Sequence, residues 1–343
     1  MHEIEFSIII PMYNTENFVA QAIQSAINQS YKDIEIICVD DKSTDESVRI
    51  VKEFMAKDKR IKLICNDRNL GTFATRNNGA INANGEHLLF LDADDYLHKD
   101  TCLKCHKILK TSKPNAMRCW GGGIDFIMFN LLRQDEDNGK FKLCKVCDKT
   151  QIIDDIVFEA MYFGKDEPFY SIWNKCIKRT AYLKALDFAN VTRKITIAED
   201  ILISMALLGV SKTIALLDCE LYYYCYNKNS TTRTDEPSKL QERIENLNFV
   251  ISKFEEYADK KDEYYRVFMQ GMCKVINTHI SGNQTQRFVE AYKKRVEKGY
   301  PKWLARLILS LQRKRFKAQE KEKILCDFIK ENKKLFKEIQ EKM

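Results

Sequence analysis

The first hundred residues alternate regularly between strand-like and helix-like segments. Short apolar, β-branched runs are followed by stretches whose apolar residues recur at helical spacing. The expected strands are residues 6–10, 34–39, 61–65 and 87–91, and the expected helices are residues 17–28, 45–55 and 74–83. A strand, a helix and a second strand in succession favour a parallel sheet, because parallel neighbours need a crossover connection. We therefore predict an α/β fold with a doubly wound sheet flanked by helices.

The fourth expected strand breaks abruptly into three carboxylates. The apolar run that starts at His87 ends in Asp92, Ala93, Asp94 and Asp95. If the strand alternation continues, Asp92 and Asp94 lie on the same side at its carboxyl end, where open α/β sheets bind ligands. Paired carboxylates there suit Mg²⁺ or Mn²⁺ bound to phosphate oxygens. The alternative is a solvated acidic turn.

The loop after the first strand excludes the common glycine-rich phosphate sites. It reads Pro11-Met12-Tyr13-Asn14-Thr15-Glu16, whereas an NAD or FAD site requires Gly-x-Gly-x-x-Gly at this place. The Gly-Lys-Ser/Thr ending of the ATPase phosphate loop is absent as well. Phosphate must then be held in another way, and a metal ion at Asp94 would supply one.

Composition limits the class of protein. Hydrophobic residues make up 45% of the 343 residues, enough for a substantial core, and the net charge of +7 is too modest for a dedicated nucleic-acid binder. No secretory signal and no apolar run of membrane-spanning length is evident, so we expect a cytoplasmic protein. Its 12 cysteines are then expected to be reduced thiols. The pairs Cys102/Cys105 and Cys144/Cys147 are farther apart than in the usual zinc ribbon, so a structural zinc site is the less favoured alternative.

The second half of the chain gives weaker signals. Aromatic runs at 169–173 and 222–226 suit flat sugar faces, but such clusters are more often core. Residues 299–317 form a basic amphipathic pattern that fits a membrane surface, a second copy of the chain or packing on the domain equally well. We expect a domain at 1–235, with halves at 1–100 and 101–235, and a helical carboxyl-terminal region at 236–343.

Four motifs in chain order resemble the inverting glycosyltransferases of family 2, which have the GT-A fold. The motifs span Ile8–Asn14, Val39–Asp45, Asn69–Gly79 and Leu91–Asp95. The resemblance covers about residues 5–230. It implies a Rossmann-like nucleotide-sugar domain with a mixed sheet, and an enzyme that transfers a hexose or N-acetylhexosamine from a UDP-sugar to a glycan or glycolipid acceptor.

The resemblance assigns a donor site. Its residues are Pro11, Tyr13, Asn14, Asp40, Asp41, Arg76, Asp92 and Ala93. Tyr13 would stack on uracil, while Asp40 or Asp41 accepts a hydrogen bond from the base or ribose. Arg76 would supply a cation near the nucleotide.

The resemblance also assigns the chemistry. Asp94, together with Asp92, would hold Mn²⁺ or Mg²⁺ against the diphosphate leaving group. Asp200 would act as the base for the acceptor hydroxyl, at the start of a helix that runs through Leu208. From the residues alone, an acidic helix start is an equally good reading of Glu199 and Asp200.

The acceptor side is expected at Trp173, Asn174, Lys175 and Glu199, with a loop at 229–231 near the diphosphate. Glu199 is expected to raise the pKa of Asp200 or to orient the acceptor. On the membrane interpretation of residues 299–317, the protein would lie peripherally on the inner face of a bacterial membrane. Two other functions compete: a catalytically silent nucleotide-sugar binding or scaffold protein, and a sugar-phosphate nucleotidyltransferase. The second would need a Gly-rich, basic first loop, which is absent.

Overall fold

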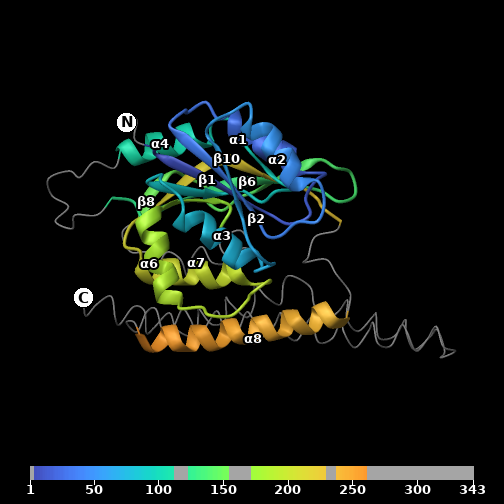
Figure 1. Ribbon diagram of the computed structural model, residues 1–343. Coiled ribbons are helices and arrows are strands. Elements are labelled where there is room, and N and C mark those ends of the chain that lie inside the picture. The colour runs from blue at the N-terminus through green and yellow to red at the C-terminus, as the bar shows by residue number, and fades with distance from the viewer. Residues whose placement is uncertain (1–3, 112–122, 154–170, 229–236, 261–343) are drawn as a thin grey trace. The chain divides into compact units, whose positions relative to one another are not determined.

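A computed structural model of the chain describes residues 4–111, 123–153, 171–228 and 237–260 (Figure 1). Two compact units make up the chain, Met1–Asn227 and Lys228–Met343. No helix among the described residues is long and apolar enough to cross a membrane.

The first unit opens with the expected alternation of strands and helices. The elements are β1 (Phe6–Met12), α1 (Val19–Ile27), β2 (Ile34–Asp40), α2 (Ser47–Met55), β3 (Ile61–Cys65), α3 (Thr72–Ile81) and β4 (His87–Phe90). All seven lie within two or three residues of the predicted ranges, because β1 and β2 are apolar runs that are buried throughout and α1 buries residues at helical spacing.

The rest of this unit is mixed, as expected for residues 101–235. Its elements are β5 (Tyr96–Leu97), α4 (Thr101–Thr111), β6 (Phe126–Gln134), β7 (Phe141–Cys144), β8 (Gln151–Ile153), β9 (Lys175–Lys178), α6 (Arg179–Ala189), α7 (Glu199–Val210) and β10 (Ile214–Tyr224).

One mixed sheet forms the centre of the unit. Its strand order is β3-β2-β1-β4-β9-β6-β10-β5, with β7 beside β6 and β8 beside β10. The strands β3, β2, β1 and β4 are parallel, whereas β9 is antiparallel to both of its neighbours. Figure 1 shows α1, α2 and α4 on one face of the sheet and α3, α6 and α7 on the other. The predicted α/β fold with a mixed sheet is therefore confirmed.

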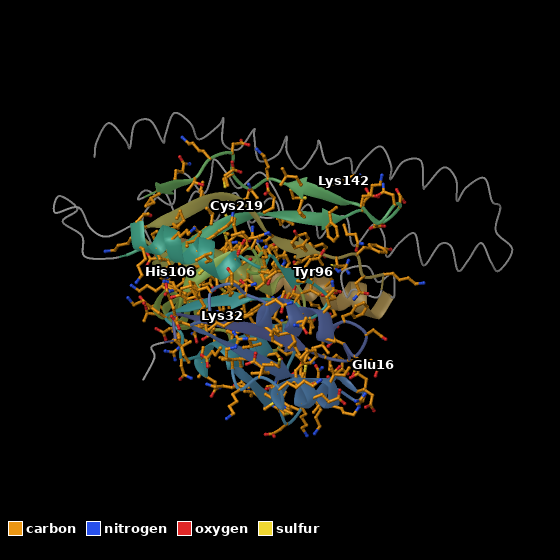
Figure 2. All side chains as sticks on the ribbon, turned by 90° about the horizontal axis from the view of Figure 1, so that it is seen from above. Glu16, Lys32, Tyr96, His106, Lys142 and Cys219 are labelled. Carbon is orange, nitrogen blue, oxygen red and sulfur yellow. The ribbon has the colours of Figure 1, made fainter. Side chains whose placement is uncertain are left out.

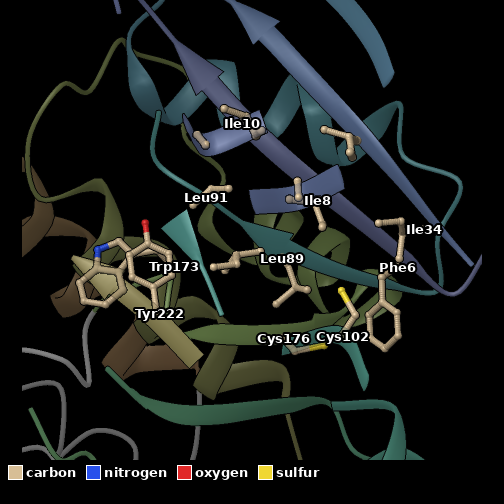
Figure 3. Packing of buried hydrophobic residues seen from close by; sticks show 14 of the residues in the cluster. Phe6, Ile8, Ile10, Ile34, Leu89, Leu91, Cys102, Trp173, Cys176 and Tyr222 are labelled. Carbon is tan, nitrogen blue, oxygen red and sulfur yellow. The ribbon is translucent and has the colours of Figure 1, made fainter. Parts of the chain in front are cut away.

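Alternate residues of β1 pack on opposite faces of the sheet. Ile8 and Ile10 belong to a hydrophobic cluster with residues of α1 and α4 (Figure 3). Ile9 faces α3, where a Cβ added to Gly79 would come within 2.5 Å of its Cγ2 atom. Glycine at residue 79 thus lets α3 approach the sheet closely.

In the second unit, the described helix is α8 (Pro237–Lys260). Ile244, Leu247, Val250, Phe254 and Tyr257 are buried and recur every three or four residues, so they form one apolar face.

Candidate active site

The acidic residues after β4 lie where the order of the sheet reverses. The chain goes from β1 outward to β2 and β3 and then returns to β4 on the other side of β1. Such a reversal is where open α/β sheets bind ligands, beyond the carboxyl ends of their strands. Glu16 lies shortly after the carboxyl end of β1, and Lys32 lies shortly before the amino end of β2. Figure 2 shows these two residues toward opposite sides of the unit.

The acidic segment is a turn and not a continuation of β4. The strand ends at Phe90, and the N–H of Asp95 donates to the carbonyl of Asp92 at 3.0 Å. The expected strand alternation of Asp92 and Asp94 is therefore wrong, because the backbone bonds close on the segment itself and not on a neighbouring strand. The two carboxylates are nevertheless near enough for Asp92 to raise the pKa of Asp94.

Tyr222 of β10 stabilises this turn through two hydrogen bonds of its hydroxyl group. Its hydroxyl donates to Asp95 Oδ2 at 2.8 Å and accepts from the N–H of Asp92 at 3.2 Å. The N–H of Cys225 donates to the other oxygen of Asp95 at 2.7 Å. Burial and the neighbouring carboxylates raise the pKa of Asp95 well above its usual range. Asp95 thus connects the turn to Tyr222 and Cys225 through hydrogen bonds. The sequence pattern did not predict this role.

Arg76 joins the acidic turn to the candidate base. It lies on α3 with a side chain only 6% exposed, and its Nη2 atom is 2.6 Å from Asp92 Oδ1. Its Nη1 atom pairs with Asp200 and lies 3.2 Å from Glu199 Oε1. The side chains of Asp92 and Asp200 keep 26% and 23% exposure, so solvent and ligands can reach both carboxylates. We call these four residues the Arg76 junction.

The first turn of α7 carries the two acidic residues that pair with Arg76. Glu199 and Asp200 occupy the first turn of the helix, as the sequence predicted. Ala198 before them has a φ of 67°, in the left-handed region. A residue with a Cβ pays roughly 1–2 kcal/mol for this conformation, and such strain persists where surrounding contacts dictate it.

The charges of the junction shift the pKa values of its members. Burial disfavours the charge of Arg76, but Asp200, Asp92 and Glu199 together raise its pKa. Burial and then Asp200 raise the pKa of Glu199 to about 8. Burial also raises the pKa of Asp200, against the opposing effect of Arg76. Glu199 and Asp200 therefore repel each other, and the charge of each disfavours the charge of the other.

Asp94 is the carboxylate best suited to a divalent cation. Its Oδ2 atom accepts from Asn227 Nδ2 at 2.9 Å, and burial and then Asp92 raise its pKa, so an added positive charge would be favourable. Asp92 is already paired with Arg76. Among the described residues no cluster of three or more acidic, histidine or cysteine side chains is arranged for a metal. Mg²⁺ typically needs only one or two carboxylates beside substrate phosphates and water, so Asp94 fits that mode of binding.

The residues expected to bind the nucleotide differ in their exposure and in their hydrogen bonds. Tyr13 is 48% exposed directly after β1, which leaves its ring available for stacking. Asn14 has a φ of 53° and accepts from the N–H of Thr44 at 2.8 Å. Asp40 accepts from the N–H of Ser43 at 3.2 Å.

The carboxylate of Asp41 holds the loop that precedes α3. Its carboxylate accepts from the N–H groups of Leu70 and Gly71 at 2.7 and 2.8 Å and from Asn66 Nδ2 at 2.9 Å. Gly71 has a φ of 86°, which favours glycine, and α3 starts directly after it. Asp41 therefore shapes the loop that leads to Arg76. Asp40 and Asp41 are each 4% exposed, and Asp40 accepts from one backbone N–H group where Asp41 accepts from two.

Several other predicted site residues are buried. Pro11 lies within β1, and Ala93 is 4% exposed. Trp173 stacks on Tyr222 with ring centroids 4.7 Å apart, in the core cluster (Figure 3). Asn174 is fully buried. These side chains are therefore packed in the interior of the unit and stabilise the fold around the site.

His106, Cys102 and Cys105 lie on α4 and are not members of the Arg76 junction. His106 of α4 bonds to Glu5 at 2.8 Å and lies beside the ring of Tyr31, a packing role. Cys102 and Cys105 are buried free thiols. The structure does not describe four other parts of the chain that the sequence draws attention to: residues 229–231, residues 299–317, His279 and Cys119.

Residues 7–165 match the family model described as Glycosyl transferase family 2. The match places these residues in glycosyltransferase family 2. The recognition made from the four motifs is thereby confirmed.

Individual relatives agree with this match. The chain is 28% identical over 236 residues to glycosyltransferase GlyA of Streptococcus pneumoniae, covering 67% of this chain and 32% of that protein. It is 37% identical over 113 residues to a poly(ribitol-phosphate) beta-glucosyltransferase of Bacillus spizizenii, covering 32% of this chain and 18% of that protein. The chain thus spans less than a third of the length of either relative.

The fold of the chain also has a solved counterpart. The crystal structure of S. aureus TarS 1-349 in complex with UDP-GlcNAc superposes with a TM-score of 0.63 at 19% identity, covering 96% of this chain and 92% of that one. At this identity the likeness concerns the GT-A-like fold alone.

Proposed function

We propose that this protein transfers a hexose or N-acetylhexosamine from a UDP-sugar to a hydroxyl group of a glycan or glycolipid acceptor, with inversion at the anomeric carbon. The observation that carries the proposal is the Arg76 junction. One guanidinium binds Asp92 of the acidic turn and Asp200 of α7, so the donor end and the candidate base share one small site.

Asp200 is the proposed general base. The pKa of an acceptor hydroxyl is far above neutral, so its proton must be removed as its oxygen attacks. The carboxylate of Asp200 is partly exposed, and burial raises its pKa toward the range in which a base works well near neutral pH. Arg76 opposes this shift and keeps Asp200 ionised and oriented.

The donor is proposed to lie across the carboxyl ends of β1, β2 and β4. Tyr13 offers a ring for the uracil, and Asp40 offers a hydrogen-bond acceptor for the base or ribose. Asp94 would hold Mn²⁺ or Mg²⁺, which supplies charge neutralisation to the diphosphate leaving group. The likeness to TarS, whose crystal structure contains UDP-GlcNAc, supports a UDP-sugar donor.

A single displacement follows from this arrangement. A base on one side of the sugar and a stabilised leaving group on the other give inversion, as in other glycosyl chemistry with an oxocarbenium-like transition state. The proposal requires no covalent nucleophile. The poly(ribitol-phosphate) beta-glucosyltransferase relative supports a surface-glycan acceptor. A membrane location rests on the sequence pattern of residues 299–317 alone.

The experiment measures UDP release from a panel of UDP-sugars with mixed glycan acceptors, in Mn²⁺ and in chelator. Wild type is compared with Asp94→Asn, Asp200→Asn and the control Asp187→Asn, which changes an exposed aspartate of α6. We expect metal-dependent turnover of one donor, lost in the first two variants and kept in the control. Equal donor binding by all four proteins without any turnover would instead establish a binding or scaffold protein.

A further inference from the structure

Lys175 is a buried cation close to the proposed base. It is the first residue of β9 and only 1% exposed. Its Nζ atom donates to the carbonyl oxygen of Ser171 and lies 3.3 Å from Asn174 Oδ1. Burial lowers the pKa of Lys175 to about 7, against the opposing charge of Asp200. A buried ammonium group is costly, so its presence calls for a compensating interaction.

The carbonyl that Lys175 binds belongs to the same peptide group as the N–H of Ile172. That N–H hydrogen-bonds to the carboxylate of Asp200 and lowers its pKa. A peptide group is planar and trans, so its C=O and N–H point in opposite directions. The ammonium group of Lys175 thus lies at one end of this dipole and the carboxylate of Asp200 at the other.

The segment that carries this peptide group is fixed to the core. The N–H of Phe129 donates to the carbonyl of Asn174 at 3.1 Å, and Asn174 Nδ2 donates back to the carbonyl of Phe129 at 3.4 Å. Ile172 is fully buried, and Trp173 stacks on Tyr222. Because Ile172, Trp173 and Asn174 are held in the core, the peptide group is anchored by the residues that follow it in the chain.

We propose that Lys175 is a positioning residue for Asp200, acting through the Ser171–Ile172 peptide group. The ammonium group polarises the carbonyl and so strengthens the N–H on the far side as a donor to the carboxylate. Lys175 itself is enclosed and need not touch a substrate. This inference rests on the proposed function, because it presumes that Asp200 is the base.

The kinetic test compares Lys175→Met and Lys175→Gln with Lys178→Met, a control at the other end of β9. The assay is UDP release from the donor that the panel identifies, with the same acceptor mixture. We expect Lys175→Met to lower kcat by on the order of tenfold with an unchanged donor KM, because hydrogen bonds to charged groups are worth this much. Lys175→Gln, which keeps a neutral donor, should fall between Lys175→Met and wild type, and the control should match wild type.

A double variant separates positioning from general structural damage. If Lys175 acts through Asp200, adding Lys175→Met to Asp200→Asn causes little further loss, because the group that it serves is already gone. An equal loss in both backgrounds, or a wild-type kcat in Lys175→Met, would overturn the inference while leaving Asp200 as the base. Wild-type activity in Asp200→Asn would overturn the proposed base itself.

A readout independent of activity is the amide resonance of Ile172. In protein labelled with ¹⁵N-isoleucine, this peak is assigned by its loss in Ile172→Val. We expect its proton shift to change in Lys175→Met, Lys175→Gln and Asp200→Asn but not in Lys178→Met. An Ile172 amide that is unchanged in both folded Lys175 variants would contradict the proposed relay.

Discussion

Replacing Arg76 with methionine tests the Arg76 junction as a unit. The substitution keeps an apolar stem in a side-chain site that is only 6% exposed, but it removes the cation shared by Asp92, Glu199 and Asp200. Removing one partner of a buried ion pair costs about 3–5 kcal/mol. Because Asp92 and Asp200 keep 26% and 23% exposure, water can relax part of this cost. We therefore expect a loss of about 3 kcal/mol in the free energy of unfolding at pH 8.5.

The assay is urea denaturation followed by circular dichroism. A loss of this size lowers the midpoint by roughly 1 M urea for a slope of about 3 kcal/mol/M. The control is Arg49→Met on α2, where the arginine also pairs with two glutamates but is 59% exposed. Because surface pairs contribute little, we expect no measurable change in the control.

The effect of Arg76→Met also depends on pH with a definite sign. The folded-state pKa values of Glu199 and Asp200 are already raised, and loss of the guanidinium raises them further. Raised carboxyl pKa values lower stability as pH rises through them, so the deficit is largest at pH 8.5 and smaller at pH 5.5, where both acids can be neutral. A deficit no larger than that of Arg49→Met, or one that grows as the pH falls, would refute the assignment of a shared buried cation.

Three further changes test other parts of the account. Gly79→Ala should cost about 1–3 kcal/mol in a thermal melt, because the new Cβ would lie 2.5 Å from Ile9 Cγ2; an unchanged melting temperature would contradict the close packing of α3 on β1. Asp41→Ala removes the acceptor of two backbone N–H groups in the loop before α3, and we expect weaker donor binding by calorimetry together with lower stability. Unchanged affinity would show that this loop does not shape the donor site. For wild type, kcat should rise with pH through an apparent pKa above that of an ordinary aspartate, because burial raises the pKa of Asp200 and a base must be deprotonated; a flat profile from pH 4 to 8 would argue against it.

The fold was predictable from the sequence where its elements are local. In the first hundred residues, β1, β2 and β4 are continuous buried runs and α1 buries residues at helical spacing, so the predicted ends lie within two or three residues of the observed ones. Glu199 and Asp200 were placed correctly at a helix start, because the acids precede an apolar helical segment. The position of β9 between β4 and β6 could not be inferred, since antiparallel insertion depends on long-range pairing.

The site was predictable as a set of residues but not as a network. Arg76 was expected near the nucleotide, yet it binds carboxylates as many as 124 residues away in sequence. The support that Tyr222 and Asn227 give to the acidic turn carries no spacing signal. Periodicity reports which face of an element is buried, whereas such contacts depend on how distant elements meet.

The most direct test of the central claim is the single-turnover rate of transfer in Asp200→Asn, with saturating donor and acceptor. A general base typically contributes about 10²–10⁴-fold to the rate, so we expect a loss of that order with an unchanged dissociation constant for the donor. The amide keeps the shape of the side chain and removes only its ability to accept the proton. Transfer at the wild-type rate by this variant would contradict the assignment of Asp200 as the base and, with it, the proposed mechanism.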